Sequence, residues 1–175
     1  MTMPNAANYS SVERLRDGRQ IEIRSFRPED RDELTSTVAR VGALSLYRRF
    51  FTLKQSFSER EKAFFLNVDF EKHVALVAMT EEAGQQVMVG GARYVIVQPG
   101  KAEVAFLVVD QYQGQGIGAA LLRNLANLAR AGGLNALVAE VLPENTPMLK
   151  VFEKSGFPMT TTRDPDVSHV TLQLA

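Results

Sequence analysis

The sequence predicts an α/β fold with a mixed, mainly antiparallel central sheet of about six to seven strands, flanked by helices. Three observations lead to this prediction. Hydrophobic residues make up 45% of the 175 residues, enough to bury a sizeable core in one domain. In the middle of the chain, strand-like segments follow one another with short turns, as antiparallel strands do. Toward the C-terminus, strand-like and helical segments alternate, which is typical of a mixed sheet.

The first part of the chain begins with a polar segment. Residues 1–18 contain no apolar run and are expected to form a flexible N-terminal arm, so that a single domain spans residues 19–175. Residues 20–26 alternate apolar and polar side chains, as a half-buried strand does. Helical segments are expected next, over residues 28–39, 44–51 and 58–67.

The remaining elements alternate strands with a glycine-rich loop and two helices. Three strands are expected in the middle of the chain, over residues 73–80, 87–97 and 102–109. The glycine-rich loop follows the third of these strands. The expected elements after the loop are a helix to about residue 131, a strand over 135–142, a helix over 145–156, and two strands over 159–163 and 169–174.

Charge and composition exclude several classes of protein. Lys plus Arg and Asp plus Glu both number 20, so the net charge of zero argues against a general nucleic-acid binder. There is no cysteine, which excludes disulfides, zinc–thiolate sites and a cysteine nucleophile. No signal peptide and no apolar run of roughly 20 residues is present, so a soluble cytoplasmic protein without membrane partners is expected. His73 and His169 have no second ligand at useful spacing, so no metal site is expected.

The glycine-rich loop is the first candidate for a binding site. Gly114, Gly116 and Gly118 stand between an expected strand and the start of an expected helix. Glycine leaves room for a ligand against the backbone, and the free N–H groups at a helix start favour an anion, above all a phosphate. As Gly-x-Gly-x-x-Ala, residues 114–119 also fit a dinucleotide fingerprint, with Glu140 roughly 20 residues on. The preceding antiparallel strands and the short remaining chain disfavour that fold.

The same loop resembles that of a known enzyme family. Residues 113–118, Gln-Gly-Gln-Gly-Ile-Gly, match the Gln/Arg-x-x-Gly-x-Gly/Ala pyrophosphate loop of the GCN5-related N-acetyltransferases. Residues 102–109 resemble that family's fourth strand, and residues 145–157, an Asn followed by a helix ending in Gly-Phe, resemble its second cofactor motif. Residues 45–51 and 139–157 look most like the acetyltransferase domain of bacterial Pat-type protein lysine acetyltransferases.

This resemblance implies the acetyltransferase fold and acetyl-CoA as cosubstrate. Strands four and five, here residues 102–109 and 135–142, would splay apart to form the cleft. Arg123 would either meet an adenosine-side phosphate or be a solvated surface arginine. The residues expected to bind acetyl-CoA are the main chain of Leu107, Val108 and Val109, the loop residues Gln113, Gly114, Gln115, Gly116, Ile117, Gly118 and Ala119, and Asn145, Met148 and Phe152 beside the pantetheine arm.

Acetyl transfer to an amine sets the remaining chemical requirements. A lysine amine is almost wholly protonated at pH 7, which costs about 4.6 kcal/mol, so a general base is needed. Glu103 matches the strand-four glutamate that serves as base in lysine-directed members, and its apolar neighbours would raise its pKa. Glu140 is the second candidate, as base or as a group that orients the acceptor. A backbone N–H of Val108 or Val109 would stabilise the thioester oxygen. Phe152 stands where the family often has a tyrosine acid.

The leading prediction is therefore an acetyl-CoA-dependent N-acetyltransferase with a protein lysine as acceptor. The alternatives are an acetyltransferase for a small-molecule amine, a non-catalytic acyl-CoA-binding regulatory module and a dinucleotide binder. The sequence does not identify the acceptor, and it does not determine the oligomeric state, for which a homodimer is one alternative.

Overall fold

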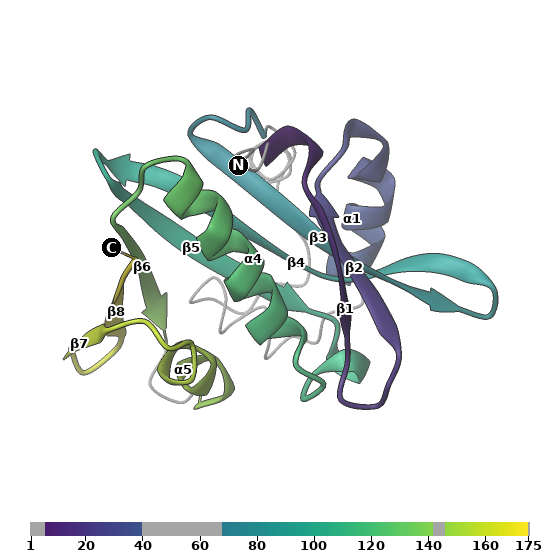
Figure 1. The fold of residues 1–175 in the computed structure, drawn as a ribbon. Coiled ribbons are helices and arrows are strands. Elements are labelled where there is room, and N and C mark those ends of the chain that lie inside the picture. Colours follow the sequence, from purple (N-terminus) through teal and green to yellow (C-terminus); the bar gives the residue numbers. More distant parts are fainter. Residues whose placement is uncertain (1–5, 40–67, 142–145, 175) are drawn as a thin grey trace.

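The computed structural model describes residues 6–39, 68–141 and 146–174, which form one eight-stranded sheet with helices on both faces (Figure 1). The strand order is β1-β2-β3-β4-β5-β6-β8-β7, and every neighbouring pair is antiparallel except β5–β6. The mixed, mainly antiparallel sheet predicted from the sequence is thereby confirmed. The strands are β1 (Ser10–Arg14), β2 (Gln20–Ser25), β3 (His73–Glu82), β4 (Gln85–Gln98), β5 (Lys101–Val108), β6 (Ala136–Val141), β7 (Met159–Arg163) and β8 (Ser168–Gln173).

The helices follow the expected positions in the described parts of the chain. The α-helices are α1 (Arg31–Ala39), α4 (Ile117–Ala131) and α5 (Thr146–Glu153), and the short 3-10 turns are η1 (Ala6–Asn8), η2 (Pro28–Asp30) and η3 (Asp110–Tyr112). The helices expected over residues 44–51 and 58–67 lie outside the described residues.

One strand differs from the sequence-based expectation. The polar pattern predicts a flexible arm over residues 1–18, whereas Ser10–Arg14 forms β1 and pairs antiparallel with β2 along its whole length. The strand lies at the edge of the sheet, and Val12 remains 65% exposed. Such a strand buries little apolar surface of its own, so its hydrogen bonds to β2 hold it in place and no hydrophobic pattern marks it in the sequence.

The two faces of the sheet are buried against different helices. Alternate residues of a strand point to opposite faces. On one face Val74, Leu76 and Ala102 join the core that α4 covers with Leu121 and Leu125 (Figure 1). On the other face Leu34 of α1 packs with Ala75, Val77 and Met88. The amphipathic sequence of α4 therefore fixes which face of the sheet is the larger core.

The pair β5–β6 opens into a wedge. These parallel strands are paired only where Lys101, Ala102 and Glu103 face Ala136, Leu137 and Val138. Beyond Glu103, β5 continues to Val108 and β6 to Val141 without further pairing between them. The sequence pattern does not predict β1, so the fourth and fifth strands that it predicts are β5 and β6 in the structure. The splay predicted between those two strands is present.

Candidate functional site

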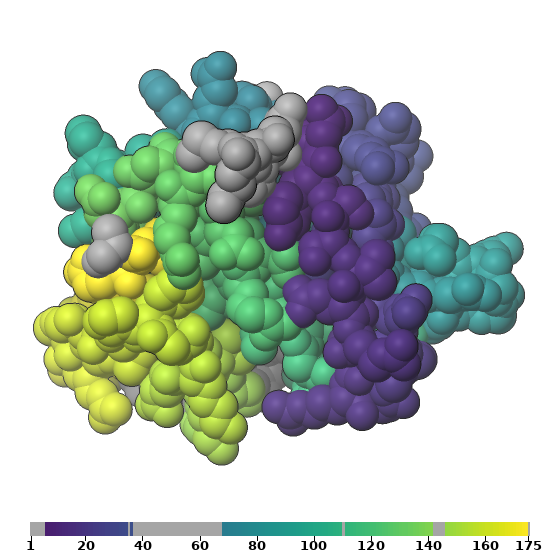
Figure 2. Space-filling view, viewed as in Figure 1, coloured from purple at the N-terminus to yellow at the C-terminus, as the bar shows by residue number. Residues whose placement is uncertain are grey.

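A cleft of about 490 Å³ occupies the wedge between β5 and β6. Its walls come from β5, the loop before α4, the first turn of α4, the end of β6 and one side of α5. Figure 2 shows the surface hollowed between α5, in yellow-green, and the turn between β1 and β2, in purple. The structure brings these sequence-predicted residues together around the cleft: Glu103, Leu107, Val108, Gln113, Gly114, Gly116, Ile117, Gly118, Ala119, Glu140, Met148 and Phe152.

Of the predicted site residues that the structure describes, Val109 and Gln115 do not line the cleft. Val109 is only 2% exposed and belongs to the core under α4. Gln115 is half-buried in the loop, and its carbonyl accepts a hydrogen bond from the N–H of Arg16, with an N–O distance of 3.4 Å. Asn145 lies outside the described residues.

The register between β4 and β5 decides which backbone groups face the cleft. The N–H of Val109 donates to the carbonyl of Val89 in β4 at 2.9 Å. Backbone groups of an antiparallel strand alternate in direction, so Leu107 also directs its peptide groups to β4, while Phe106 and Val108 direct theirs away. Gln113 Nε2 accordingly reaches the carbonyl of Val108 at 3.1 Å. Val108 therefore offers the N–H at the cleft, and the alternative donor Val109 has its N–H already bonded.

The glycine-rich loop has the geometry of an anion site. Gly114 and Gly116 have φ values of 81° and 96°, a backbone conformation that favours glycine. Gly116 is the N-cap of α4 without a side-chain cap, and its carbonyl accepts the first helical hydrogen bond, from Ala120. The N–H groups that precede Ala120 in the first turn have no partner within the helix and point out of its end. A Cβ added at either glycine would meet no described atom within 4 Å, so the space beside the loop is open.

Two carboxylates lie on the opposite side of the wedge from this loop. Glu103 stands between Ala102 and Val104, which face the α4 core, so its own side chain points to the other face of the sheet. Glu103 pairs with Val138, so these two side chains point to the same face of the sheet. Glu140 is two residues after Val138 on β6 and therefore points to that face as well. Glu103 is exposed, so the apolar enclosure expected from its sequence neighbours is not found among the described residues.

His169 lies beside Glu140 at the rim of the cleft. Its Nδ1 lies 3.7 Å from Oε1 of Glu140, and its Nε2 lies 2.8 Å from Oδ2 of Asp164. The pairing of β6 with β8 places His169 directly opposite Glu140. His169 is thus a partly exposed residue that contacts two carboxylates. The part of the chain that the structure describes contains no group of three or more side chains suited to a metal ion.

Phe152 forms an apolar wall of the cleft. It is only 1% exposed, and its ring meets Phe106 edge to face at a centroid distance of 5.9 Å and an interplanar angle of 72°. Phe106 lies on β5 and Phe152 on α5, so the two rings join the strand to the helix across the wedge. Edge-to-face pairs of this kind contribute about 0.5–1.5 kcal/mol beyond the buried area.

The fold and this site match a known family. A model described as the acetyltransferase (GNAT) family matches residues 39–157. The chain belongs to the GNAT acetyltransferase family. An acetyltransferase from Pseudomonas aeruginosa is 32% identical over 158 residues, which cover 90% of this chain and 84% of that relative. The acetyltransferase Pat of Mycolicibacterium smegmatis is 32% identical over 144 residues, or 81% of this chain, and the match spans 42% of Pat.

Solved structures of the GNAT fold agree. The GNAT domain of the S. lividans PAT protein superimposes with a TM-score of 0.84 at 32% identity, covering 94% of this chain and 96% of that domain. The yncA acetyltransferase of Salmonella typhimurium, solved with its cofactor acetyl-CoA, shares the fold with a TM-score of 0.71 at 20% identity, over 89% of this chain and 94% of that one. The resemblance to Pat-type domains is thereby confirmed, and the protein is an acetyl-CoA-dependent GNAT N-acetyltransferase.

The GNAT cleft has the features that acetyl-CoA requires. The open loop at the start of α4 offers N–H groups for phosphate, and the free edge of β5 offers backbone partners for the amides of the pantetheine arm. Three cations that sequence reasoning missed stand at the rim: Arg16, Lys150 and Lys154. Lys150 lies in α5 and Lys154 directly follows its last residue, so their spacing of four positions puts both on one side of this segment, which is a signal the sequence does carry.

Arg123 has a different role from the one considered for it. Its guanidinium forms an ion pair with Glu13 of β1, and its side chain is 59% exposed. It is not among the residues that line the cleft. Of the two interpretations of Arg123, the surface residue is therefore the one that this structure favours.

No helix in the described ranges 6–39, 68–141 and 146–174 has the length and apolar character needed to cross a membrane.

Proposed function

We propose that this GNAT enzyme transfers the acetyl group of acetyl-CoA directly to the side-chain amine of a protein lysine, with Glu103 as the general base. The observation that carries the proposal is the position of Glu103 and Glu140, which line the same cleft as the glycine-rich loop on the side away from α4. An ammonium group entering between two carboxylates would be both attracted and relieved of a proton. Similarity to Pat acetyltransferases supports a protein acceptor.

We expect the cosubstrate to lie along the groups that line the wedge. In this proposal the diphosphate binds the loop residues Gln113–Ala119, and the pantetheine arm follows β5 through the backbone of Phe106 and Val108. Met148 and Phe152 of α5 supply the apolar wall against the arm. Asn145 remains a predicted partner of the arm. The thioester would then lie beside Val108, with the two carboxylates beyond it.

The reaction needs few groups from the protein. Glu103 takes a proton from the lysine ammonium, and the neutral nitrogen attacks the thioester carbonyl. The N–H of Val108 stabilises the negative charge that develops on the carbonyl oxygen. The C–N bond forms and the C–S bond breaks, so that CoA leaves as a thiolate that solvent protonates. The attacking nitrogen gives up its second proton to solvent, which leaves the neutral amide. With no cysteine in the sequence and Phe152 carrying no hydroxyl, neither a thioester-linked enzyme nor a proton donor at Phe152 takes part.

Mass spectrometry of host-cell proteins tests the acceptor class. The proteins are incubated with acetyl-CoA and either the wild-type enzyme or Glu103→Gln, and the acetylated peptides are compared. We expect a defined set of lysines to gain acetyl groups with wild type and to gain far fewer with the variant. If proteins gain none while a panel of small amines consumes acetyl-CoA, the acceptor is a small molecule and the protein-lysine proposal fails.

A further inference from the structure

The turn between β1 and β2 carries an arginine to the mouth of the cleft. Arg16 lies in this turn, and its side chain lines the cleft beside the glycine-rich loop. Its Nη1 donates to the carbonyl of Gly114 at 3.3 Å, and its backbone N–H donates to the carbonyl of Gln115 at 3.4 Å. Both contacts are made to the segment whose N–H groups face the expected diphosphate. A residue from near the N-terminus therefore stands at the phosphate end of the cleft.

Contacts on both sides of Arg16 fix the turn in this position. Leu15 is only 5% exposed and is part of the core under α4. Arg19 donates to the hydroxyl of Tyr112 at 3.3 Å, and its guanidinium carbon lies 4.9 Å from the centre of the same ring. Tyr112 ends the short turn η3 that leads into the glycine-rich loop. The backbone position of Arg16 is thus set by contacts of the residues on either side of it, while its own side chain is exposed.

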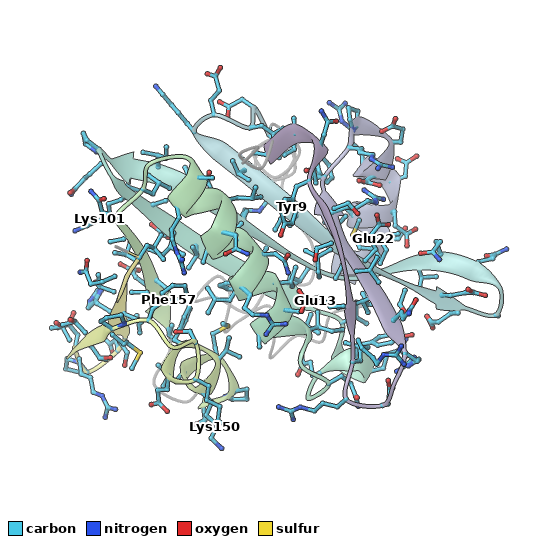
Figure 3. All side chains as sticks on the ribbon, in the orientation of Figure 1. Tyr9, Glu13, Glu22, Lys101, Lys150 and Phe157 are labelled. Atoms are coloured by element: carbon cyan, nitrogen blue, oxygen red, sulfur yellow. The ribbon has the colours of Figure 1, made fainter. Side chains whose placement is uncertain are left out.

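The strand before the turn is also tied to α4. Tyr9 and Glu13 both hydrogen-bond to the side chain of Asn124, which is only 3% exposed. Figure 3 shows these two side chains between the N-terminal segment and α4. Asn124 in turn donates to the carbonyl of Ala120, one turn after the N-cap. The β1–β2 hairpin and the start of α4 therefore form one unit.

The charge of Arg16 has no counterpart in the described structure. Arg19 pairs with Asp17, and Arg24 pairs with Asp30, whereas no carboxylate in the described ranges forms an ion pair with Arg16. One Nη1–H of its guanidinium is bonded to a carbonyl, which leaves further N–H groups for a second partner. An unpaired, positioned guanidinium beside a loop of outward-facing N–H groups is suited to an oxyanion, and above all to a phosphate.

We propose that Arg16 binds an oxygen of the acetyl-CoA diphosphate, so that the β1–β2 hairpin is part of the cosubstrate site. This inference rests on the diphosphate placement proposed above, and it does not depend on the acceptor. The 3′-phosphate of CoA has the same chemistry and is the competing partner. The contacts of Arg16 to Gly114 and Gln115 favour the diphosphate, because these two residues belong to the diphosphate loop itself.

Binding measurements without an acceptor test this role. Dissociation constants for CoA and for 3′-dephospho-CoA are measured by calorimetry for the wild type, Arg16→Gln and Arg16→Lys. We expect Arg16→Gln to weaken both ligands by a similar factor, on the order of tenfold to a hundredfold, as the loss of one charge-assisted hydrogen bond does. Arg16→Lys keeps the positive charge but lacks the planar guanidinium with its paired N–H donors, so it should recover part of the affinity.

A matched control comes from the same hairpin. Arg14 is exposed, donates to the carbonyl of Gly18 at 3.5 Å, and does not line the cleft. Arg14→Gln removes the same charge and should change both dissociation constants less than about threefold, because solvent screens a distant exposed charge. Thermal unfolding of each variant without ligand checks that the hairpin remains folded. If Arg16→Gln does not fold, the dissociation constants of Arg16→Lys are compared with those of the wild type. The expected result is then a weaker affinity of Arg16→Lys for both ligands.

Two results would overturn the proposal, and a third would point elsewhere. Unchanged affinity in Arg16→Gln removes Arg16 from the site. A loss seen with CoA and absent with 3′-dephospho-CoA assigns Arg16 to the 3′-phosphate and contradicts the diphosphate contact. Unchanged CoA affinity in a folded Gly116→Val variant would instead remove the diphosphate from the loop, which is a failure of the placement on which the inference rests.

Discussion

At the scale of single residues, the proposed chemistry depends on which carboxylate takes the proton. Glu103 lies on β5, the strand proposed to run beside the thioester, whereas Glu140 lies on β6 and has His169 beside it. Glu103→Gln is nearly isosteric, so it should keep the fold and the affinity for acetyl-CoA while it removes the proton acceptor. We expect kcat/KM at pH 7 to fall about 10²–10⁴-fold. The loss should shrink toward high pH, because more of the amine is already neutral.

A pH–rate profile of the wild type, Glu103→Gln and Glu140→Gln with one acceptor makes this measurement. Glu140→Gln is the matched control from the facing strand, and it should raise KM for the acceptor more than it lowers kcat. A Glu103→Gln rate close to wild type at pH 7 would transfer the role of base to Glu140 or to a water. A large loss that stays constant to pH 10 would mean that Glu103 positions the acceptor without taking its proton.

Phe152 should act by packing. It is buried against Phe106 and carries no group that can donate a proton. Phe152→Ala should lower the free energy of unfolding by about 3–5 kcal/mol, which urea denaturation measures. Phe152→Tyr should leave the steady-state turnover within a few-fold of wild type. A rate increase above about tenfold in Phe152→Tyr would show that a missing acid limits the reaction.

At the scale of elements, the loop before α4 is expected to bind the cosubstrate through its backbone. Gly116 has a φ of 96°, and the space beside it is open. Gly116→Val places a branched side chain where a phosphate oxygen would approach, in a conformation that β-branched residues avoid. The variant should fold but lose most of its affinity for acetyl-CoA in calorimetry, with its far-UV circular dichroism and cooperative unfolding as the test of folding. Wild-type affinity would contradict the assignment of residues 113–119.

The close approach of β4 and β5 depends on Gly90. A Cβ at this position would lie 2.8 Å from the carbonyl oxygen of Leu107 in β5, so one of the two backbones must move. Gly90→Ala should lower the free energy of unfolding by roughly 1–3 kcal/mol and also weaken acetyl-CoA binding, because β5 is a wall of the cleft. Gly132→Ala is the control, since its Cβ would meet nothing closer than 3.4 Å. Equal stability of the two variants would show that β5 shifts without cost.

At the scale of the whole molecule, a buried ion pair is expected to make the free energy of unfolding depend on pH in the acidic range. Arg24 and Asp30 are 8% and 7% exposed and pair through two hydrogen bonds of 2.8 and 2.9 Å. Burial acts to raise the pKa of Asp30, but the hydrogen bonds from Arg24 and from the backbone N–H of Arg27 outweigh it and hold that pKa below its ordinary value. The folded state therefore binds the proton of Asp30 more weakly than the unfolded state does. This contribution to stability is present above about pH 4 and is lost as the pH falls through the lowered pKa.

Replacement of one partner should expose this dependence. Asp30→Asn leaves the buried guanidinium of Arg24 without its charge partner, so the free energy of unfolding at pH 7 should fall by about 3–5 kcal/mol. The variant should also lose less stability than the wild type between pH 5 and pH 3, as urea denaturation at each pH will measure. Asp166→Asn, at an exposed aspartate, serves as the control and should follow the wild-type curve. Parallel curves for Asp30→Asn and wild type would assign the acid sensitivity to other carboxylates.

Local features of the chain account for most of the agreement between prediction and structure. The strands around Ala102–Val109 and the helix after Gly116 follow from alternation and from apolar spacing, which depend only on neighbours in the sequence. The loop is recognisable because its need for positive φ restricts two positions to glycine. Glu103 could be placed on the strand, but its exposure could not, because the shape of the wedge depends on how β6 diverges from β5.

The sequence by itself determined the sheet class and the order of the central strands along the chain, and it predicted the glycine-rich loop and the two carboxylates as site residues, because each is encoded by residues close together in the chain. The tertiary structure alone decided three features. Strand β1 exists only through its pairing with β2. The N–H of Val108 faces the cleft because the N–H of Val109 donates to Val89 in β4 and backbone groups alternate in direction along the strand. Arg16 reaches Gly114, 98 positions further along the chain, because the hairpin packs on α4. Contacts between distant segments set these positions, and no local pattern of residues carries that information.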